Sequence, residues 1–253
     1  MFVRSICIFL MCICFFSAYT QKIDTVKSHT ISLPYTLLKI GTAKEKEKMP
    51  VILFLHGAGE RGRDNSIQIT VGLPQLIHSI KKTHHFPCII VAPQCPTDDK
   101  WVDTDWASLS HQMAFSMTKS LSGAIELLDS IIKINPAVDL NRIYVTGISM
   151  GGFGTWELLQ RYPNKFAAAI PICGGGDTSQ VSQIKRCPIW AFHGKKDKLV
   201  KVSRTIDMYN KLSEINGGVK LSILEKEGHL CWNSVYKNEN VVNWLFSNSN
   251  REK

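Results

Sequence analysis

The sequence predicts an α/β fold in which a mostly parallel central sheet is covered by helices on both faces. Continuous apolar runs of strand length recur along the chain, as in strands that are buried on both sides of a parallel sheet. Segments with helical periodicity lie between most of these runs, so strand and helix alternate. A chain of 253 residues, 44% of them hydrophobic, can bury one sizeable core and is rather long for two. One domain, spanning residues 25–250, is therefore expected.

The first expected element is an edge strand at His29–Ile40, in which apolar and polar residues alternate loosely. A charged turn and a first buried strand at Val51–Leu55 follow it. The later buried strands are expected at Ile89–Ala92, Ile143–Thr146, Ala167–Ile170, Ile189–Phe192 and Leu221–Leu224. The helices are expected at Leu73–Lys82, Leu121–Ile134, Met150–Arg161, Ser203–Ile215 and Val241–Phe246. Right-handed crossovers then bring the carboxyl ends of the strands to one edge of the sheet, where ligands bind in folds of this kind.

Residues 1–20 have the pattern of a secretory signal peptide. One basic residue, Arg4, precedes the apolar run Ile6–Phe16, and small or polar residues follow it. The protein is therefore expected to be secreted or periplasmic, without stable membrane insertion after cleavage; an uncleaved membrane anchor is the alternative. Cleavage removes three of eight cysteines and leaves an odd number, so at least one thiol stays free or pairs between chains. The remaining cysteines are Cys88, Cys95, Cys173, Cys187 and Cys231.

The net charge of +9 does not indicate a nucleic-acid surface. Such a surface interleaves basic and aromatic residues along one face, whereas Lys44–Lys48 alternates in sign. The sequence contains no C-x-x-C motif, which removes the support for zinc-ribbon and thioredoxin folds. We therefore expect no nucleic-acid partner and no metal, while an anionic polysaccharide or cell surface stays open as a partner.

A nucleophile motif, Gly147-Ile148-Ser149-Met150-Gly151, stands between an expected strand and an expected helix. This strand–turn–helix context is the one that the G-x-S-x-G motif requires. The turn holds the serine in a strained backbone conformation with its hydroxyl exposed, and glycines two residues to either side let strand and helix approach closely. Ser149 is therefore the predicted nucleophile.

A serine hydroxyl needs a base to take its proton and a carboxylate to orient that base. Asp197 follows one later strand and His229 follows the next, which gives the order Ser–Asp–His of α/β-hydrolases. Competing histidines precede the serine or, like His193, are flanked by apolar residues and are expected to pack or to bond a loop. The competing acids are Asp177, close to the preceding strand, and Asp207, within an expected helix.

Two backbone amides are expected to form an oxyanion hole, those of Met150 and Ala58. Ala58 belongs to a glycine-rich loop after an early strand, in which His56 is expected to bond the loop rather than to exchange protons. The same loop spells G-x-G-x-x-G, but no helix opens after it and no acidic residue follows at the distance that a dinucleotide site needs. The tract Gly174–Gly176 lacks the Lys-Ser/Thr of a phosphate-binding loop and is expected to border the catalytic pocket.

Five segments carry a resemblance to a known family: Phe54–Gly62, Val91–Pro96, Gly147–Trp156, Pro171–Gly176 and Ile189–Gly194. Together they resemble the secreted bacterial α/β-hydrolases of the phospholipase/carboxylesterase-like, polyhydroxybutyrate-depolymerase-like and prolyl-oligopeptidase-like groups. The resemblance covers nearly all of the chain after the leader and implies the triad Ser149, Asp197 and His229, the oxyanion donors Ala58 and Met150, and no cofactor. It departs at Leu230-Cys231-Trp232, where a small or acidic residue and a serine are expected before the tryptophan.

These features predict a serine esterase that works through an acyl-enzyme. Trp101, Trp106 and Trp232 are expected near the carboxyl edge of the sheet, either as aromatic pocket walls or as core residues. Aromatic walls would suit an acetyl or feruloyl ester carried on carbohydrate. Two alternatives stay open, a small-peptide peptidase and a catalytically silent binding module, and the sequence does not give the oligomeric state.

Overall fold

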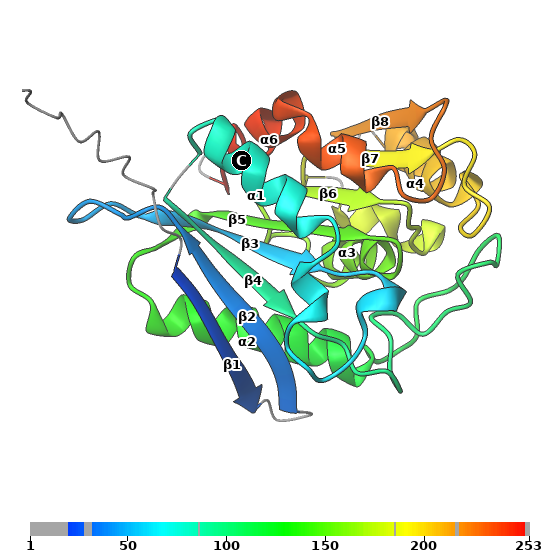
Figure 1. Cartoon of the computed structure of the whole chain (residues 1–253). Helices are drawn as coiled ribbons and strands as arrows, with labels where there is room; N and C mark the ends of the chain where they lie inside the picture. The colour runs from blue at the N-terminus through cyan, green and yellow to red at the C-terminus, as the bar shows by residue number, and fades with distance from the viewer. Residues whose placement is uncertain (1–19, 28–31, 86, 185, 216–217, 251–253) are drawn as a thin grey trace, which may run out of the picture.

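The central feature of the fold is an eight-stranded sheet with strand order β1-β2-β4-β3-β5-β6-β7-β8 (Figure 1). The computed structural model describes residues 20–27, 32–85, 87–184, 186–215 and 218–250. β1 and β2 pair antiparallel, as do β2 and β4, while every other neighbouring pair is parallel. The prediction of a mostly parallel sheet is therefore confirmed. The strands are β1 (Thr20–Lys27), β2 (Ser32–Ile40), β3 (Met49–Leu55), β4 (Cys88–Pro93), β5 (Val138–Ile148), β6 (Ala168–Ile172), β7 (Ile189–Gly194) and β8 (Val219–Leu224).

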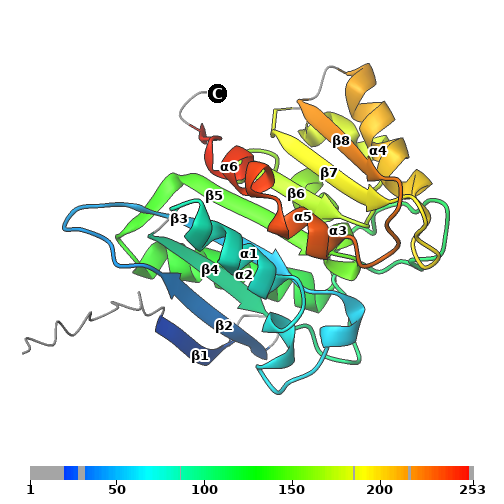
Figure 2. The same cartoon turned by 45° about the horizontal axis from the view of Figure 1, so that its top comes forward.

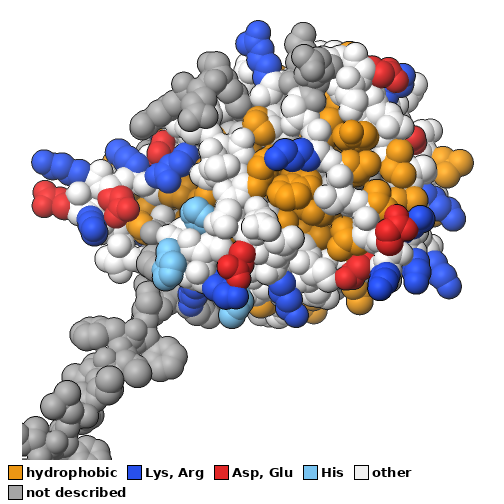
Figure 3. All heavy atoms as spheres, turned by 90° about the horizontal axis from the view of Figure 1, so that it is seen from above, with side chains coloured by type: hydrophobic (Ala, Val, Ile, Leu, Met, Phe, Trp, Pro, Cys, Tyr) orange, Lys and Arg blue, Asp and Glu red, His pale blue; other side chains and the backbone are white. Residues whose placement is uncertain are grey.

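Helices cover both faces of the sheet, as predicted (Figures 1 and 2). On one face α2 (Lys119–Ile134), α3 (Met150–Arg161) and α4 (Ser203–Glu214) contribute to one buried cluster. On the other face α1 (Leu73–Lys82), α5 (Trp232–Lys237) and α6 (Glu239–Phe246) contribute to a second. Figure 3 shows hydrophobic side chains gathered among basic ones on the face of the molecule seen from above. None of the described helices is long and apolar enough to cross a membrane.

β5 and α3 lie at the centre of the molecule and carry the turn in which the nucleophile motif sits. Successive residues of β5 point to opposite faces of the sheet: Tyr144 packs into one buried cluster and Val145 into the other. α3 is buried on nearly every side, from Met150 to Gln160. A turn between two elements packed in this way has little freedom to move, which suits a site that needs fixed geometry.

The largest departures from the predicted elements are β1 and α5. β1 begins at Thr20, the last residue of the predicted leader, and pairs with β2 in the register Thr20↔Lys39. The β1 sequence contains lysine and aspartate and few apolar residues, so its hydrophobic periodicity does not predict a strand. The segment is extended because it pairs with β2. α5 has six residues, too few to display a helical period. The predicted signal peptide lies outside the described residues except for Thr20, and so does the start of the predicted strand, 29–31.

Candidate active site

Ser149, Asp197 and His229 come from three separate turns at the carboxyl edge of the sheet. Ser149 lies between β5 and α3, Asp197 follows β7, and His229 follows β8. Because these strands are parallel neighbours or near neighbours, their carboxyl ends lie on the same side of the molecule. The fold therefore brings together three residues that are 80 positions apart in sequence at most.

The turn at Ser149 has the strained geometry that its sequence predicts. Ser149 has φ 53° and ψ −117°, a backbone conformation that residues other than glycine rarely adopt. A Cβ atom at Gly147 would lie 2.3 Å from the Gly151 carbonyl oxygen, and one at Gly151 would lie 2.0 Å from the Leu55 carbonyl oxygen. The prediction that glycines at these two positions permit close approach of strand and helix is confirmed.

A continuous hydrogen-bond chain joins the three side chains. His229 Nδ1 lies 2.6 Å from Asp197 Oδ2, and His229 Nε2 lies 2.8 Å from Ser149 Oγ. An ionised carboxylate only accepts hydrogen bonds, so Nδ1 keeps its proton and donates a hydrogen bond to Asp197. Nε2 is then free to accept the hydroxyl proton of Ser149. This arrangement is the one in which an imidazole can act as a general base toward a serine.

The Asp197 carboxylate is held ionised by the groups around it. Burial on its own would raise the pKa of Asp197, but hydrogen bonds from His193, His229 and the Val200 amide outweigh burial and hold that pKa well below its usual value. Oδ1 accepts from the amides of Leu199 at 2.8 Å and Val200 at 3.0 Å. Asp197 can therefore orient His229 and stabilise its imidazolium without taking up a proton itself.

His193 is a second histidine on the same carboxylate, and this contact was not predicted from the sequence. Its Nε2 lies 3.1 Å from Asp197 Oδ2 and 3.1 Å from the Val200 carbonyl, while Nδ1 lies 2.7 Å from Thr205 Oγ1. The side chain is fully buried. The prediction that His193 packs or bonds a loop is confirmed. No local sequence pattern indicates that the turn after β7 brings the Asp197 carboxylate back to the His193 ring.

The two residues expected to supply oxyanion donors come from α3 and from the glycine-rich loop after β3. Met150 is the first residue of α3, and amides in the first turn of a helix lack partners within the helix. Ala58 opens a short 3₁₀ helix, Ala58–Glu60, and lines the same pocket as Ser149. The glycine-rich loop therefore forms a 3₁₀ turn and not the α-helix that a dinucleotide site needs.

His56 stabilises that loop, as predicted. Its Nε2 accepts a hydrogen bond of 3.0 Å from the Cys95 amide, so Nδ1 donates to the Gly57 carbonyl at 2.6 Å. Burial lowers the pKa of His56 to about 4, which keeps the ring neutral. The indole nitrogen of Trp101 donates to the His56 carbonyl at 3.0 Å. Trp101 is fully buried and therefore belongs to the core and not to the pocket wall.

A cavity of about 590 Å³ opens beside Ser149 and His229. Trp106 and Trp232 line it, so these two of the three tryptophans singled out in the sequence are wall residues. The Trp232 ring meets the His229 ring edge-on, with centroids 5.2 Å apart. Leu199 and Leu230 also line the cavity and are largely exposed. The walls are mainly apolar, which favours a ligand with an apolar group next to the reacting carbon.

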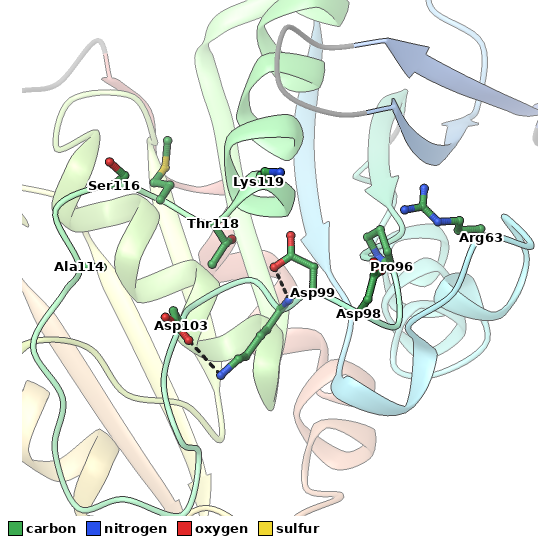
Figure 4. Close-up of a pocket in the computed structure, with 11 residues that line it drawn as sticks. Arg63, Pro96, Asp98, Asp99, Asp103, Ala114, Ser116, Thr118 and Lys119 are labelled. Atoms are coloured by element: carbon green, nitrogen blue, oxygen red, sulfur yellow. Dashed lines mark hydrogen bonds and ion pairs between the residues drawn. The ribbon is translucent and has the colours of Figure 1, made fainter.

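A second, more polar cavity of about 650 Å³ contains none of the three site residues (Figure 4). Lys100 and Asp103 both line it and form an ion pair of 3.1 Å with each other. Asp99 Oδ2 accepts from the Ser120 amide at 3.0 Å and from its hydroxyl at 2.7 Å, which caps the start of α2. These contacts give Lys100, Asp103 and Asp99 structural roles. The cavity next to Ser149 is the better candidate site although it is smaller, because it contains the serine and histidine of the hydrogen-bond chain.

The competing acids have other roles. Asp177 accepts hydrogen bonds from the Met113 amide at 2.8 Å and from Ser179, and thereby ties down a loop. Asp207 lies within α4, as its predicted position in a helix requires. Cys173, His193 and Asp197 place possible ligand atoms within 4.8 Å of one another. The Asp197 oxygens already accept the four hydrogen bonds described above, so this cluster does not offer a free carboxylate to a metal ion.

The fold and the three-residue site together define an α/β-hydrolase with a serine nucleophile motif. The profile of the phospholipase/carboxylesterase family matches residues 39–238, and the chain belongs to that family. Membership supports a serine hydrolase of the carboxylesterase type.

Similar proteins agree with the family. The structure of a thermostable esterase superposes with a TM-score of 0.82 and 36% sequence identity over 90% of this chain and 63% of that one. A bifunctional acetylxylan esterase/xylanase of Neocallimastix patriciarum is 32% identical over 84 residues, which cover 33% of this chain and 12% of that protein. A poly(3-hydroxyalkanoate) depolymerase C of Paucimonas lemoignei is 44% identical over 50 residues, or 20% of this chain and 12% of that one. The chain thus spans a small part of the curated relatives it matches.

Replacing Asp197 should change how stability depends on acid. The folded-state pKa of Asp197 lies below its unfolded value of about 3.9, so its ionised form stabilises the folded state above roughly pH 4. That contribution is lost as the pH falls through the folded-state value. We expect Asp197→Asn to unfold at a lower temperature at neutral pH, and to lose less further stability than the wild type between pH 4 and pH 2.

Thermal unfolding followed by circular dichroism from pH 7 to pH 2 measures this difference. Asp98→Asn removes the same charge from an exposed position and is the matched control, which should follow the wild-type curve. Parallel curves for Asp197→Asn and the wild type would contradict the assignment of acid sensitivity to Asp197.

Proposed function

We propose that this protein is an exported serine esterase in which Ser149, His229 and Asp197 are the catalytic triad. The observation that carries the proposal is the hydrogen-bond chain from Asp197 through His229 to Ser149, which ends at the mouth of an apolar cavity. The family match and the thermostable esterase support an ester as the substrate.

In the proposed reaction His229 takes the hydroxyl proton as Ser149 attacks the acyl carbon. The amides of Met150 and Ala58 stabilise the oxyanion of the tetrahedral intermediate. His229 then gives its proton to the leaving alcohol, which produces an acyl-enzyme. Water repeats the same steps and releases the acid. Nothing in these steps requires a cofactor.

The proposed substrate class is an acetyl or feruloyl ester carried on carbohydrate. Trp106, Trp232 and Val71 give the cavity an apolar wall that suits a methyl or aromatic acyl group. Asp105 and Asn233 line the same cavity and offer hydrogen bonds to sugar hydroxyls. One relative is named an acetylxylan esterase/xylanase, and a structure that shares the fold at 16% identity is named a ferulic acid esterase.

A substrate panel tests this proposal. It contains p-nitrophenyl acetate, acetylated xylan, methyl ferulate and an aminoacyl-p-nitroanilide. We expect turnover of the esters, with the anilide at background. Faster cleavage of the anilide would indicate the small-peptide peptidase. A folded protein that neither turns over esters nor is labelled by a fluorophosphonate would indicate the silent binding module.

Export is the second part of the proposal. It is supported by the leader pattern of residues 1–20 and by an uncharacterized secreted protein of Arthroderma benhamiae that is 27% identical over 168 residues, which cover 61% of this chain and 16% of that protein. Expression with the native N-terminus, followed by intact-mass analysis of the exported fraction, tests it. A product that stays in the cytoplasm at full mass would contradict export.

Trp106 should determine acyl preference more than basal reactivity. It lines the cavity, whereas Trp232 is the lining tryptophan whose ring packs against the His229 ring. We expect Trp106→Ala to lower kcat/KM for methyl ferulate about tenfold, because lost aromatic contact weakens transition-state binding. The value for p-nitrophenyl acetate should fall less than about threefold.

Trp190→Ala is the matched control for this measurement. Trp190 packs against Trp244, with ring centroids 5.5 Å apart, and does not line the cavity. The control should leave the ratio of the two kcat/KM values unchanged. An equal fall for both esters in Trp106→Ala would contradict a role in acyl recognition.

A further inference from the structure

Two buried cysteines face each other beside the loop that carries His229. Cys173 directly follows β6, and Cys231 lies two residues after His229, at the start of α5. Their sulfur atoms are 3.2 Å apart, and both side chains are fully buried. Cys173 Sγ also lies 3.4 Å from the His229 carbonyl oxygen.

The separation of the two sulfurs is close to what a covalent bond requires. A disulfide has an S–S length of about 2.05 Å, so each sulfur would have to move by roughly 0.6 Å. Small rotations about the Cα–Cβ bonds supply such a shift. Cys173 has a backbone φ of 51°, an uncommon value that turns the chain sharply as it leaves β6. Cys231 is placed opposite by the loop that follows His229.

We propose that Cys173 and Cys231 form an intramolecular disulfide when the protein folds in an oxidising compartment. The oxidant is a low-molecular-weight or protein disulfide. The thiolate of one cysteine attacks it, which forms a mixed disulfide and releases one thiol. The second cysteine then attacks the mixed disulfide and releases the other thiol. The two cysteines lose two electrons and two protons in total, and the oxidant takes them up as two thiols.

In this proposal the bond forms during folding, before the two sulfur atoms are buried in the core. The neighbouring Cys231 thiol and burial raise the pKa of Cys173 well above its usual value, so the folded protein holds little reactive thiolate at this position. The same burial protects a completed disulfide from reductants in the folded state. The bond is therefore a structural crosslink and not a switch that opens in the native protein.

The crosslink ties the bend after β6 to the loop that carries His229. It closes a long loop, from residue 173 to residue 231, and so restricts the unfolded chain. It also limits how far the His229 loop can move away from the end of β6. This inference does not rest on the proposed esterase activity, and its test needs no substrate.

A peptide map of the wild-type chain tests the bond directly. The full chain is refolded in a glutathione redox buffer, unfolded without reductant, alkylated and digested. We expect one peptide pair joined through Cys173 and Cys231, with Cys187 alkylated. Recovery of Cys173 and Cys231 in alkylated form from the folded, oxidised protein would overturn the proposal, and so would their linkage to other cysteines.

Thermal unfolding gives a second readout. The oxidised wild type should unfold roughly 5–10 °C above protein that was reduced while unfolded and refolded in reductant. Cys231→Ser should show no such difference. Cys187→Ser, which alters another buried cysteine, should keep it. An equal effect of reductant on the wild type and Cys231→Ser would overturn the proposal, whereas the peptide map stands even if that variant does not fold.

Discussion

Ser149→Ala should reduce ester turnover to background, a loss of roughly five to six orders of magnitude. The substitution removes the nucleophilic oxygen that lies 2.8 Å from His229 Nε2. His229→Ala should cost about as much, and the double variant should lose little more, because the two residues act as one unit. Initial rates with p-nitrophenyl acetate and labelling with a fluorophosphonate measure these losses.

The fold should survive both substitutions. Ser149 and His229 are only partly buried, and each variant removes a polar side chain without opening a core cavity. Circular dichroism and thermal unfolding are the controls. If folded Ser149→Ala turned over esters or were labelled as well as the wild type, another residue would be the nucleophile and the proposed mechanism would be wrong.

Gly151→Ala should have the largest effect on stability. The new Cβ would lie 2.0 Å from the Leu55 carbonyl oxygen and 2.8 Å from the His56 carbonyl oxygen. Both obstacles are backbone atoms, one of them in a central strand, so they cannot rotate away as a flexible side chain could. We expect a loss of more than about 4 kcal/mol in the free energy of unfolding, or failure to accumulate as soluble protein.

Gly218→Ala is the matched control for Gly151→Ala. Apart from its own residue and its two chain neighbours, no atom lies within 4 Å of the Cβ that this substitution adds, so the stability should stay within about 0.5 kcal/mol of the wild type. Denaturant unfolding of both variants makes the comparison. A Gly151→Ala protein as stable as the control would show that strand and helix can separate at the nucleophile turn without cost.

Most of the sheet and the nucleophile turn could be predicted from local patterns. The apolar runs at Val51–Leu55 and Ile143–Thr146 are buried strands because each is apolar on both faces. The turn at Ser149 could be predicted because only glycine fits at Gly147 and Gly151. These features depend on residues that are close together in sequence, so they can be predicted from short segments of the chain.

Other features depend on pairing and packing between distant segments. β1 becomes a strand through its ladder with β2, and α5 forms where the chain turns back after His229 onto α1. No pattern separates Trp101, which bonds the His56 carbonyl in the core, from Trp106, which lines the cavity. The burial of each depends on a long loop whose course is set by contacts with other elements.

By itself the sequence determined most of the strands and helices and the strained turn at Ser149, because steric and periodic constraints act over a few neighbouring residues. It also assigned Asp197 and His229 to the site, from the order in which they follow Ser149 along the chain. Only the tertiary structure decided that His193 shares the Asp197 carboxylate and that Cys173 faces Cys231. Those contacts depend on how the loops after β6, β7 and β8 pack against one another at the edge of the sheet. Their positions are determined by the whole core, since no short segment contains both partners of the cysteine pair.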